Sequence, residues 1–146
     1  MGPINLGDIL LTPLSSIETP GGDVLHAMKH YDVGYSGFGE AYFSWVTAGA
    51  VKGWKRHHRM TMNLVVPVGR VRFVFSLDGG AIFRVEEIGV GHYARLTVPP
   101  GIWFSFQGLA SQPSLLLNIA SIPHDPDEAE RLALSEISYD WFGIKE

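Results

Sequence analysis

The sequence contains no cysteine among its 146 residues. Disulfide bonds and thiolate metal sites are therefore excluded. It also lacks any apolar run that approaches the ~18 residues of a membrane span. The segment from Met1 to Leu11 has neither a basic region nor a small-residue cleavage site. We therefore expect a cytoplasmic protein with no membrane partner.

Basic residues are few as well. There are 11 Lys and Arg against 15 Asp and Glu, which gives a formal net charge of −4. Because nucleic-acid binding needs a basic face that displaces counterions, no nucleic-acid partner is expected. Four basic residues and two histidines nevertheless lie together between Lys52 and Arg59. A local cationic cluster in an acidic protein favours a specific anionic ligand.

The residues that are abundant predict a β protein. The 17 Gly and 9 Pro separate short apolar runs, as turn residues do in a sandwich or barrel. We predict strands over residues 40–46, 63–68, 70–75, 82–85, 93–98 and 114–119, with a turn at Asp78-Gly79-Gly80.

Only two segments have a residue pattern that fits a helix. Residues 128–134 contain good helix formers after Asp125-Pro126-Asp127 and predict one short C-terminal helix. Residues 6–11 fit either a strand or a turn of helix. No repeat or boundary divides the chain, so we predict one all-β domain over residues 1–146.

The basic cluster leads into a strand-like pattern. If the chain is extended from residue 55, one face carries Lys55, His57, Arg59, Thr61 and Asn63, and the other carries Trp54, Met60, Met62, Leu64 and Val66. We interpret the polar face as the lining of a wet cavity in a barrel wall. A solvated loop of basic residues is the alternative, and the pattern alone leaves it open.

Two later segments carry further candidates. Pro99-Pro100-Gly101 predicts a tight turn that delivers Trp103, Phe104 and Phe106 onto the next strand. These aromatics could stack on a sugar or base, but they fit a plain core better. His124 beside Asp125 could be an acid–base pair or a metal site, but a turn that caps a helix explains it better.

These segments, taken in order, resemble the dTDP-4-dehydrorhamnose 3,5-epimerases and related sugar-nucleotide cupins. Residues 52–57 with 65–71 resemble the family's Arg-Gly-Leu-His segment and its following strand–Gly–strand. Residues 98–103 resemble its Ile-Pro-x-Gly-Phe turn, and residues 118–126 resemble its Tyr-Lys-x-Thr-x-x-Tyr-x-Pro ending. The resemblance implies a double-stranded β-helix (a jelly-roll, or cupin, barrel).

The resemblance also implies a homodimer, with residues 1–35 as an arm or strands at the dimer interface. The apolar side chains of Phe43 and Trp45 and the region around Trp103 offer area for such an interface.

Roles for individual residues follow from the same resemblance. Lys52 matches an arginine that contacts the nucleotide diphosphate. Lys55 matches the histidine base, and His57 matches the second histidine of the ketoisomerase branch. Asn118 falls where the family has its tyrosine acid, and His124 falls near a later tyrosine of the binding site.

Two departures from the family pattern change the expected chemistry. A lysine with its ordinary pKa of about 10.4 is a poor base near neutrality, so His57 is the better base. Asn118 can polarise a carbonyl but cannot deliver a proton. At the metal-binding positions of a cupin, this chain has Lys55 and Phe104 in place of two histidines, so neither a metal nor another cofactor is expected.

The favoured hypothesis is an enzyme that epimerises or isomerises a nucleotide-activated 4-keto-6-deoxy sugar by proton transfer beside the keto group. His57 would be the base, assisted by Lys55 and Asn118, while Lys52 and Arg59 would hold the diphosphate. The other expected substrate-binding residues are Tyr42, Glu40, Asn63, Trp103 and His124.

Two alternatives remain open. One is a divergent, non-catalytic cupin that binds the same nucleotide sugar. The other is a structural dimerisation domain.

Overall fold

The computed structural model describes residues 2–77 and 82–143. Most of the described chain is strand. The strands are β1 (Leu10–Pro13), β2 (Ser16–Ile17), β3 (Val24–Leu25), β4 (Glu40–Val46), β5 (Val51–His57), β6 (Met62–Val68), β7 (Arg70–Ser76), β8 (Phe83–Gly89), β9 (Ala94–Val98), β10 (Trp103–Gly108), β11 (Ser114–Ala120) and β12 (Ala129–Arg131). Three short 3₁₀ helices lie at Leu6–Asp8, Pro126–Glu128 and Leu134–Glu136.

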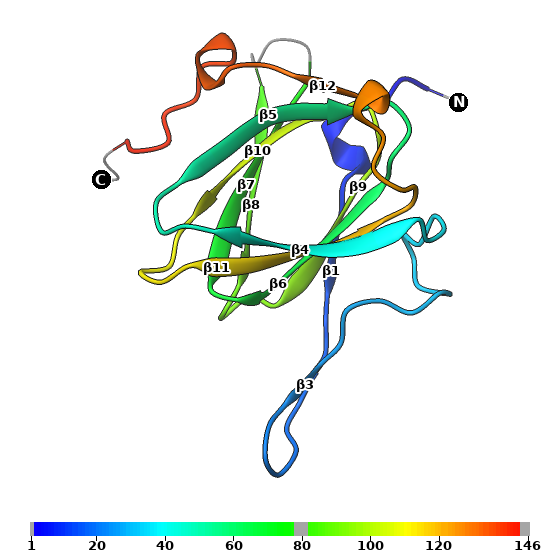
Figure 1. The fold of residues 1–146 in the computed structure, drawn as a ribbon, viewed down its shortest axis with the longest axis vertical. Helices are drawn as coiled ribbons and strands as arrows, with labels where there is room; N and C mark the ends of the chain where they lie inside the picture. Colours follow the sequence, from blue (N-terminus) through cyan, green and yellow to red (C-terminus); the bar gives the residue numbers. More distant parts are fainter. Residues whose placement is uncertain (1, 78–81, 144–146) are drawn as a thin grey trace.

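The long strands form two five-stranded antiparallel sheets that face one another. Their strand orders are β1-β9-β6-β11-β4 and β12-β5-β10-β7-β8. Seen end-on, the two sheets curve into a barrel, and the β2–β3 hairpin projects away from it (Figure 1). This arrangement confirms the predicted all-β jelly roll.

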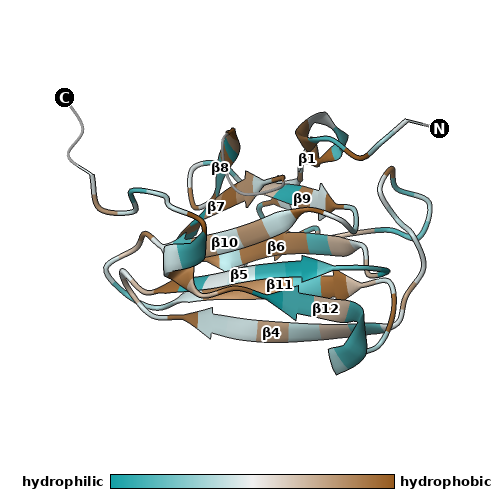
Figure 2. Ribbon diagram, turned by 90° about the horizontal axis from the view of Figure 1, so that it is seen from above, coloured by the Kyte–Doolittle hydropathy of each residue, from teal (hydrophilic) through white to brown (hydrophobic). Residues whose placement is uncertain are grey.

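The barrel is filled by apolar side chains that alternate along its inner strands. On β7, for example, Val71, Phe73 and Phe75 are fully buried and point into the core between the sheets. Leu64 on β6 and Leu96 on β9 meet them from the opposite sheet. Figure 2 shows the outcome: β6 and β7 are largely hydrophobic, while β5 and β12 are largely hydrophilic.

A second hydrophobic cluster covers the outer face of the sheet that contains β5. Buried Trp54, Val74, Trp103 and Ile137 form its centre, and Phe83, Leu132, Tyr139 and Trp141 pack against it. The C-terminal segment is therefore fixed to the outside of the barrel by aromatic contacts, including the 6.3 Å approach of the Trp54 and Trp141 ring centroids.

Most strand predictions are confirmed. Residues 40–46 are β4, and the predicted strands at 63–68, 70–75 and 114–119 lie within β6, β7 and β11. The predicted strands at 82–85 and 93–98 each begin one residue before β8 and β9. Residues 6–11 hold both elements that were considered, a 3₁₀ helix and the start of β1. The predicted turn at Asp78-Gly79-Gly80 lies outside the described residues.

The predicted helix over residues 128–134 is wrong. After a three-residue 3₁₀ helix, residues 129–131 form β12 and pair with β5, with Ala129 opposite His57 and Arg131 opposite Lys55. The edge of β5 offers unpaired backbone groups, and these override the weak helix preference of the sequence. Within the described ranges, no helix is long and apolar enough to cross a membrane.

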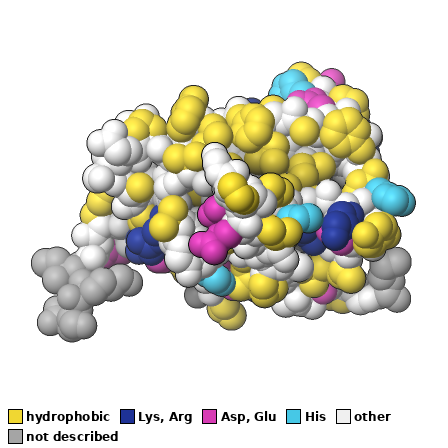
Figure 3. Space-filling view, turned by 90° about the horizontal axis from the view of Figure 1, so that it is seen from below, with side chains coloured by type: hydrophobic (Ala, Val, Ile, Leu, Met, Phe, Trp, Pro, Cys, Tyr) yellow, Lys and Arg dark blue, Asp and Glu magenta, His cyan; other side chains and the backbone are white. Residues whose placement is uncertain are grey.

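Hydrophobic side chains are also exposed on the side from which the hairpin projects (Figure 3). On β4, Phe43 and Trp45 are each 61% exposed. Such area fits the predicted homodimer, which stays a prediction, as does the role of residues 1–35 at its interface.

Removing one core side chain should destabilise the barrel. Leu96→Ala is expected to lower the free energy of unfolding by about 2–5 kcal/mol, because the fully buried leucine leaves a cavity between the sheets. Urea denaturation monitored by tryptophan fluorescence measures this loss. The matched control is Val90→Ala, at a side chain that is 67% exposed, and it should change stability little. Equal losses in the two variants would contradict the assignment of the core.

Candidate active site

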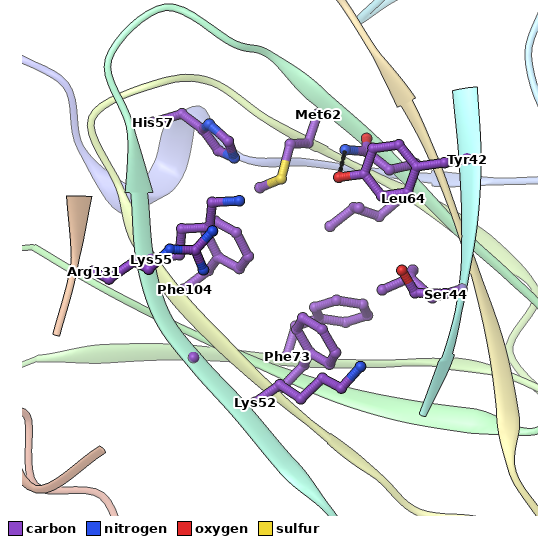
Figure 4. Close-up of a pocket in the computed structure, with 14 residues that line it drawn as sticks. Tyr42, Ser44, Lys52, Lys55, His57, Met62, Leu64, Phe73, Phe104 and Arg131 are labelled. Carbon is purple, nitrogen blue, oxygen red and sulfur yellow. Dashed lines mark hydrogen bonds between the residues drawn. The ribbon is translucent and has the colours of Figure 1, made fainter. Parts of the chain in front are cut away.

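A cavity of about 260 Å³ lies inside the barrel. Strands from both sheets supply its lining: Tyr42, Ser44, Lys52, Gly53, Lys55, His57, Met62, Leu64, Phe73, Phe104, Phe106, Leu116, Asn118 and Arg131. Figure 4 shows the polar side chains around the hollow, with His57, Lys55 and Arg131 on one side and Tyr42 and Ser44 facing them.

The charged groups of this lining are all basic. Lys52 and Lys55 come from β5, and Arg131 comes from β12; none of the described lining residues is Asp or Glu. Phe73, Phe104 and Phe106 provide an apolar floor beside these cations. A cationic wall next to aromatic surface suits a ligand that carries both an anionic group and a ring.

A bulge in β5 explains how Lys52 and Lys55 reach the same cavity despite their opposite sequence parity. On the neighbouring strand, Phe106 pairs with Lys52 and Phe104 pairs with Lys55, and the register shifts between them. The extra residue is Trp54, which is buried in the outer cluster. The bulge therefore resets the alternation and turns both ammonium groups inward.

His57 is held by a buried carboxylate. Its Nδ1 forms a short hydrogen bond with Oε1 of Glu128, and both residues are only 4% exposed. Oε2 of Glu128 accepts the backbone N–H groups of His58, Arg59 and Met60 at 3.2, 3.0 and 3.1 Å. The imidazole also stacks on Phe104, with ring centroids 5.9 Å apart. Its position is thus fixed from two directions.

These surroundings shift the pKa of both partners. Burial raises the pKa of Glu128, but its hydrogen bonds from the Arg59 N–H, the His57 side chain and the Met60 N–H outweigh burial, so the net pKa is lowered. For His57, burial lowers the pKa, Glu128 raises it, and the nearby Lys55 and Arg131 charges lower it; the net pKa lies below the ordinary 6.5. Near neutral pH the pair is therefore a carboxylate and a neutral imidazole.

This protonation state defines what the histidine can do. Because Nδ1–H donates to Glu128, Nε2 keeps its lone pair. The ring of His57 lines the cavity and turns its second nitrogen toward it (Figure 4). His57 can accordingly accept a proton from a bound molecule.

The sequence does not single out Glu128 as a site residue, because its pattern places Glu128 at the start of the predicted helix over residues 128–134. Asp125 does cap the 3₁₀ helix, through a 3.0 Å hydrogen bond from the Asp127 N–H. The helix then ends at once, and the antiparallel pairing of β12 with β5 brings Glu128 to His57 and Arg131 to Lys55. Only knowledge of that pairing would have revealed either residue.

Tyr42 and Asn118 form a polar pair on the facing sheet. They lie opposite each other on β4 and β11, and Asn118 Nδ2 donates to the Tyr42 hydroxyl at 3.1 Å. Asn118 is 3% exposed, and its Oδ1 has no hydrogen-bond partner among the described residues. The Asn118 amide therefore orients the Tyr42 hydroxyl at the cavity, and its own Oδ1 stays available as an acceptor.

Of the predicted site residues, the structure brings His57, Lys55, Lys52, Asn118 and Tyr42 together around the cavity. The remaining five lie elsewhere.

Asn63 and Arg59 lie outside the cavity because the chain is not extended from 55 to 63. β5 ends at His57, and β6 begins at Met62. Met62 and Leu64 consequently face the cavity, while Asn63 bonds to the Gly34 carbonyl and to Thr97 on the other side of the sheet. Arg59 is exposed and pairs with Asp125 at 3.2 Å.

Glu40, His124 and Trp103 are also placed elsewhere. The Glu40 carboxylate accepts the backbone N–H of His124 at the end of the barrel, where the His124 side chain is exposed. Trp103 belongs to the outer cluster and carries the Arg56 guanidinium over its ring at 4.7 Å. Within β10, alternation sends Phe104 and Phe106 inward and Trp103 outward.

Across residues 2–77 and 82–143, no group of three or more His, Asp or Glu side chains gathers in a way that could hold a metal ion.

Comparison with solved structures identifies similar proteins. A dTDP sugar isomerase from Desulfovibrio desulfuricans G20 is 34% identical, with 94% of this chain and 93% of that chain covered and a TM-score of 0.86. The sugar 3,4-ketoisomerase QdtA from Thermoanaerobacterium thermosaccharolyticum is 17% identical, with 91% and 94% covered and a TM-score of 0.75. A dTDP-4-dehydrorhamnose 3,5-epimerase from Elizabethkingia anophelis is 15% identical, with 99% and 86% covered and a TM-score of 0.76.

No protein-family model matches the chain, and no curated protein matches it.

The barrel and its inward-facing polar cavity define a cupin. Within that class, the chain belongs to the dTDP-4-dehydrorhamnose 3,5-epimerase-like family of sugar-nucleotide cupins.

Replacing the buried carboxylate by an amide tests the pair. Glu128→Gln should lower the free energy of unfolding by about 1–3 kcal/mol near neutral pH, because the amide NH₂ cannot accept the N–H donors that the carboxylate oxygens accept. It should also lower the pKa of His57 further, since the carboxylate raises that pKa. Urea denaturation and an NMR titration of the imidazole, assigned with His57→Gln, measure the two effects.

The pH dependence gives a second check on the same variant. The pKa of Glu128 is lowered in the folded protein, so its contribution to stability is present above the ordinary value of 4.5 and is lost as the pH falls below it. The difference between wild type and Glu128→Gln should shrink on acidification. An unchanged or raised His57 pKa in the variant would contradict the proposed geometry.

Proposed function

We propose that this protein is an epimerase or isomerase that acts on a nucleotide-activated 4-keto-6-deoxy sugar by moving a proton at a carbon beside the keto group. The observation that carries the proposal is the neutral, carboxylate-held His57 in a cavity whose charged lining is basic. The proposal also draws support from similar structures described as a dTDP sugar isomerase and as a ketoisomerase with bound TDP-4-keto-6-deoxyglucose.

Proton abstraction is assigned to Nε2 of His57. The hydrogens next to a ketone are weakly acidic, and their removal leaves a negative charge that spreads onto the carbonyl oxygen. Lys55 lies on the same side of the cavity as the base and stabilises that charge as it develops (Figure 4). Glu128 stabilises the imidazolium that forms at the same moment.

Proton return is assigned to Tyr42. Its hydroxyl lies across the cavity from His57, and Asn118 orients it through the 3.1 Å hydrogen bond. Asn118 occupies the β11 position where the family resemblance implies a tyrosine acid, and an amide cannot supply a proton. The hydroxyl on the neighbouring strand performs this task in its place, and Asn118 is a positioning residue.

Binding of the diphosphate is assigned to Lys52 and Arg131. Lys52 lines the cavity and anchors its ammonium to the Trp45 carbonyl at 3.2 Å. Arg131 takes over the role that was expected of Arg59, because β12 carries its guanidinium to the cavity. Phe104 and Phe106 supply apolar surface for the ring of the ligand.

Hydrogen exchange with solvent tests the proposed base. Wild-type protein incubated with dTDP-4-keto-6-deoxyglucose in deuterium oxide should incorporate deuterium beside the keto group. His57→Gln should slow incorporation by roughly 10²–10⁴-fold, the usual effect of losing a general base. The wild-type rate should fall only at pH values below 6.5, because protonation of His57 is suppressed by burial and nearby cations.

The matched control is His58→Gln. This neighbouring side chain is exposed, pairs with Glu130 and lies outside the cavity, so the variant should exchange at the wild-type rate. An equal loss of the deuterium-exchange rate in His57→Gln and His58→Gln would exclude His57 as the base. Stabilisation of the wild type by the nucleotide sugar, with no exchange and no product, would instead identify the non-catalytic binding module.

Removing the phenolic hydroxyl tests the proposed acid. Tyr42→Phe should lower product formation by about 10²-fold or more while deuterium incorporation persists, because His57 can still remove the proton and return a solvent deuteron to the same face, and only the return from the opposite side is lost. Product analysis by NMR measures both in one sample. Tyr31→Phe is the control, at a side chain that is 71% exposed. Full product formation by Tyr42→Phe would overturn the assignment.

A further inference from the structure

Lys55 occupies a position in the cavity that an electrostatic role alone does not explain. Its side chain comes from the end of the β5–β10 pairing, opposite Phe104, and its ammonium group points into the hollow beside His57 (Figure 4). Among the described residues, no side chain forms a hydrogen bond or an ion pair with the ammonium group of Lys55. Lys52 differs, because it donates to a backbone carbonyl.

The carboxylate whose charge acts on Lys55 is that of Glu128, and it already accepts hydrogen bonds from other groups. Its Oε1 accepts the His57 side chain and its Oε2 accepts three backbone N–H groups, and no hydrogen bond or ion pair joins it to Lys55. On its other side Lys55 meets a second cation, Arg131, which is its partner in the β5–β12 pairing. A lysine with no ion-pair partner and next to a guanidinium loses its proton more easily than an exposed lysine, and the uncharged amine is a nucleophile.

These surroundings lower the pKa of Lys55. Burial lowers it first, the charge of Arg131 lowers it further, and Glu128 raises it by a smaller amount, so the net pKa lies below the ordinary 10.5. The neutral imidazole of His57 next to it can relay the proton that the ammonium gives up.

We propose that Lys55 forms a Schiff base with the keto carbon of the sugar and that proton transfer takes place on the resulting iminium. This inference rests on the proposed function and adds a covalent intermediate to it. The position of Lys55 in the cavity lining, the hydrogen bonds that occupy Glu128, and the neighbouring Arg131 and His57 together carry it, because they place an amine with no ion-pair partner beside a base in the cavity proposed for the keto sugar.

The atoms balance without any redox partner. The uncharged amine attacks the keto carbon, and the carbonyl oxygen takes up protons and leaves as water, which gives the iminium. His57 then removes the neighbouring proton, and the electron pair of that C–H bond neutralises the iminium as an enamine. Tyr42 returns a proton to carbon. Water finally adds to the iminium and releases the keto sugar and the free amine.

Reductive trapping tests the proposal. Wild-type protein is incubated with dTDP-4-keto-6-deoxyglucose and sodium cyanoborohydride, which reduces an iminium in preference to a ketone. The intact mass should rise by the mass of the substrate less one oxygen atom, and peptide mapping should place the adduct on Lys55. Lys55→Arg keeps a cation but cannot form an iminium, because a guanidinium stays protonated.

Lys55→Arg should therefore give no adduct and lose at least about 100-fold in deuterium exchange, whereas a purely electrostatic residue would tolerate the replacement better. Lys29→Arg is the control for unspecific labelling, since Lys29 lies outside the cavity and should leave both the adduct and the exchange intact. Circular dichroism of each variant verifies that the barrel is folded.

The outcomes separate this inference from the function on which it rests. Exchange in the wild type without an adduct on Lys55, or exchange at the wild-type rate in Lys55→Arg, overturns the Schiff base and leaves the proton transfer standing. An adduct without exchange supports the Schiff base and overturns the proton transfer. The absence of both with this sugar overturns both.

Discussion

The hydrogen bonds accepted by the Glu128 carboxylate hold the candidate site together. One of its oxygens accepts the imidazole of His57, and the other accepts three successive backbone N–H groups of the chain that leaves β5. A buried charge needs such partners, because desolvation is otherwise too unfavourable. The same four donors that keep the carboxylate ionised thus fix the end of β5, the turn toward β6 and the orientation of the base.

That interaction depends on a segment far away in the sequence. β12 lies at the edge of its sheet; Glu128 comes immediately before it, and Arg131 is its last residue. The following residues cross to the outer face of the sheet, where Tyr139 and Trp141 pack on the cluster around Trp54. The outer aromatic cluster therefore holds β12 on β5, and β12 in turn completes the cationic side of the cavity.

Short apolar runs separated by turn residues predicted the all-β class, and the resemblance to the sugar-nucleotide cupins implied the jelly roll. β4 was predicted to the residue, and β7 within one residue of its end. The failures came where pairing overrides local pattern. The helix formers of residues 129–131 became a strand because the edge of β5 needed a partner, and the parity of residues 55–63 broke because the chain turned after His57.

The site was predicted only in part for the same reason. His57, Lys55 and Lys52 belong to one cluster in the sequence, so their proximity was visible there. Arg131 and Glu128 reach that cluster through pairing between distant strands, and the bulge at Trp54 redirects Lys52 without any mark in the residue pattern. Conversely, Trp103 and Asn63 lie outside the cavity because each faces the outer side of its sheet.

Proton abstraction by His57 requires a neutral imidazole whose proton lies on the nitrogen that faces Glu128. Nitrogen-15 NMR of the wild-type protein at pH 7, with His57 assigned by its glutamine variant, reads the protonation of each ring nitrogen directly. We expect a protonated Nδ1 and an unprotonated Nε2. A proton on Nε2 at that pH, on its own or together with one on Nδ1, would contradict it.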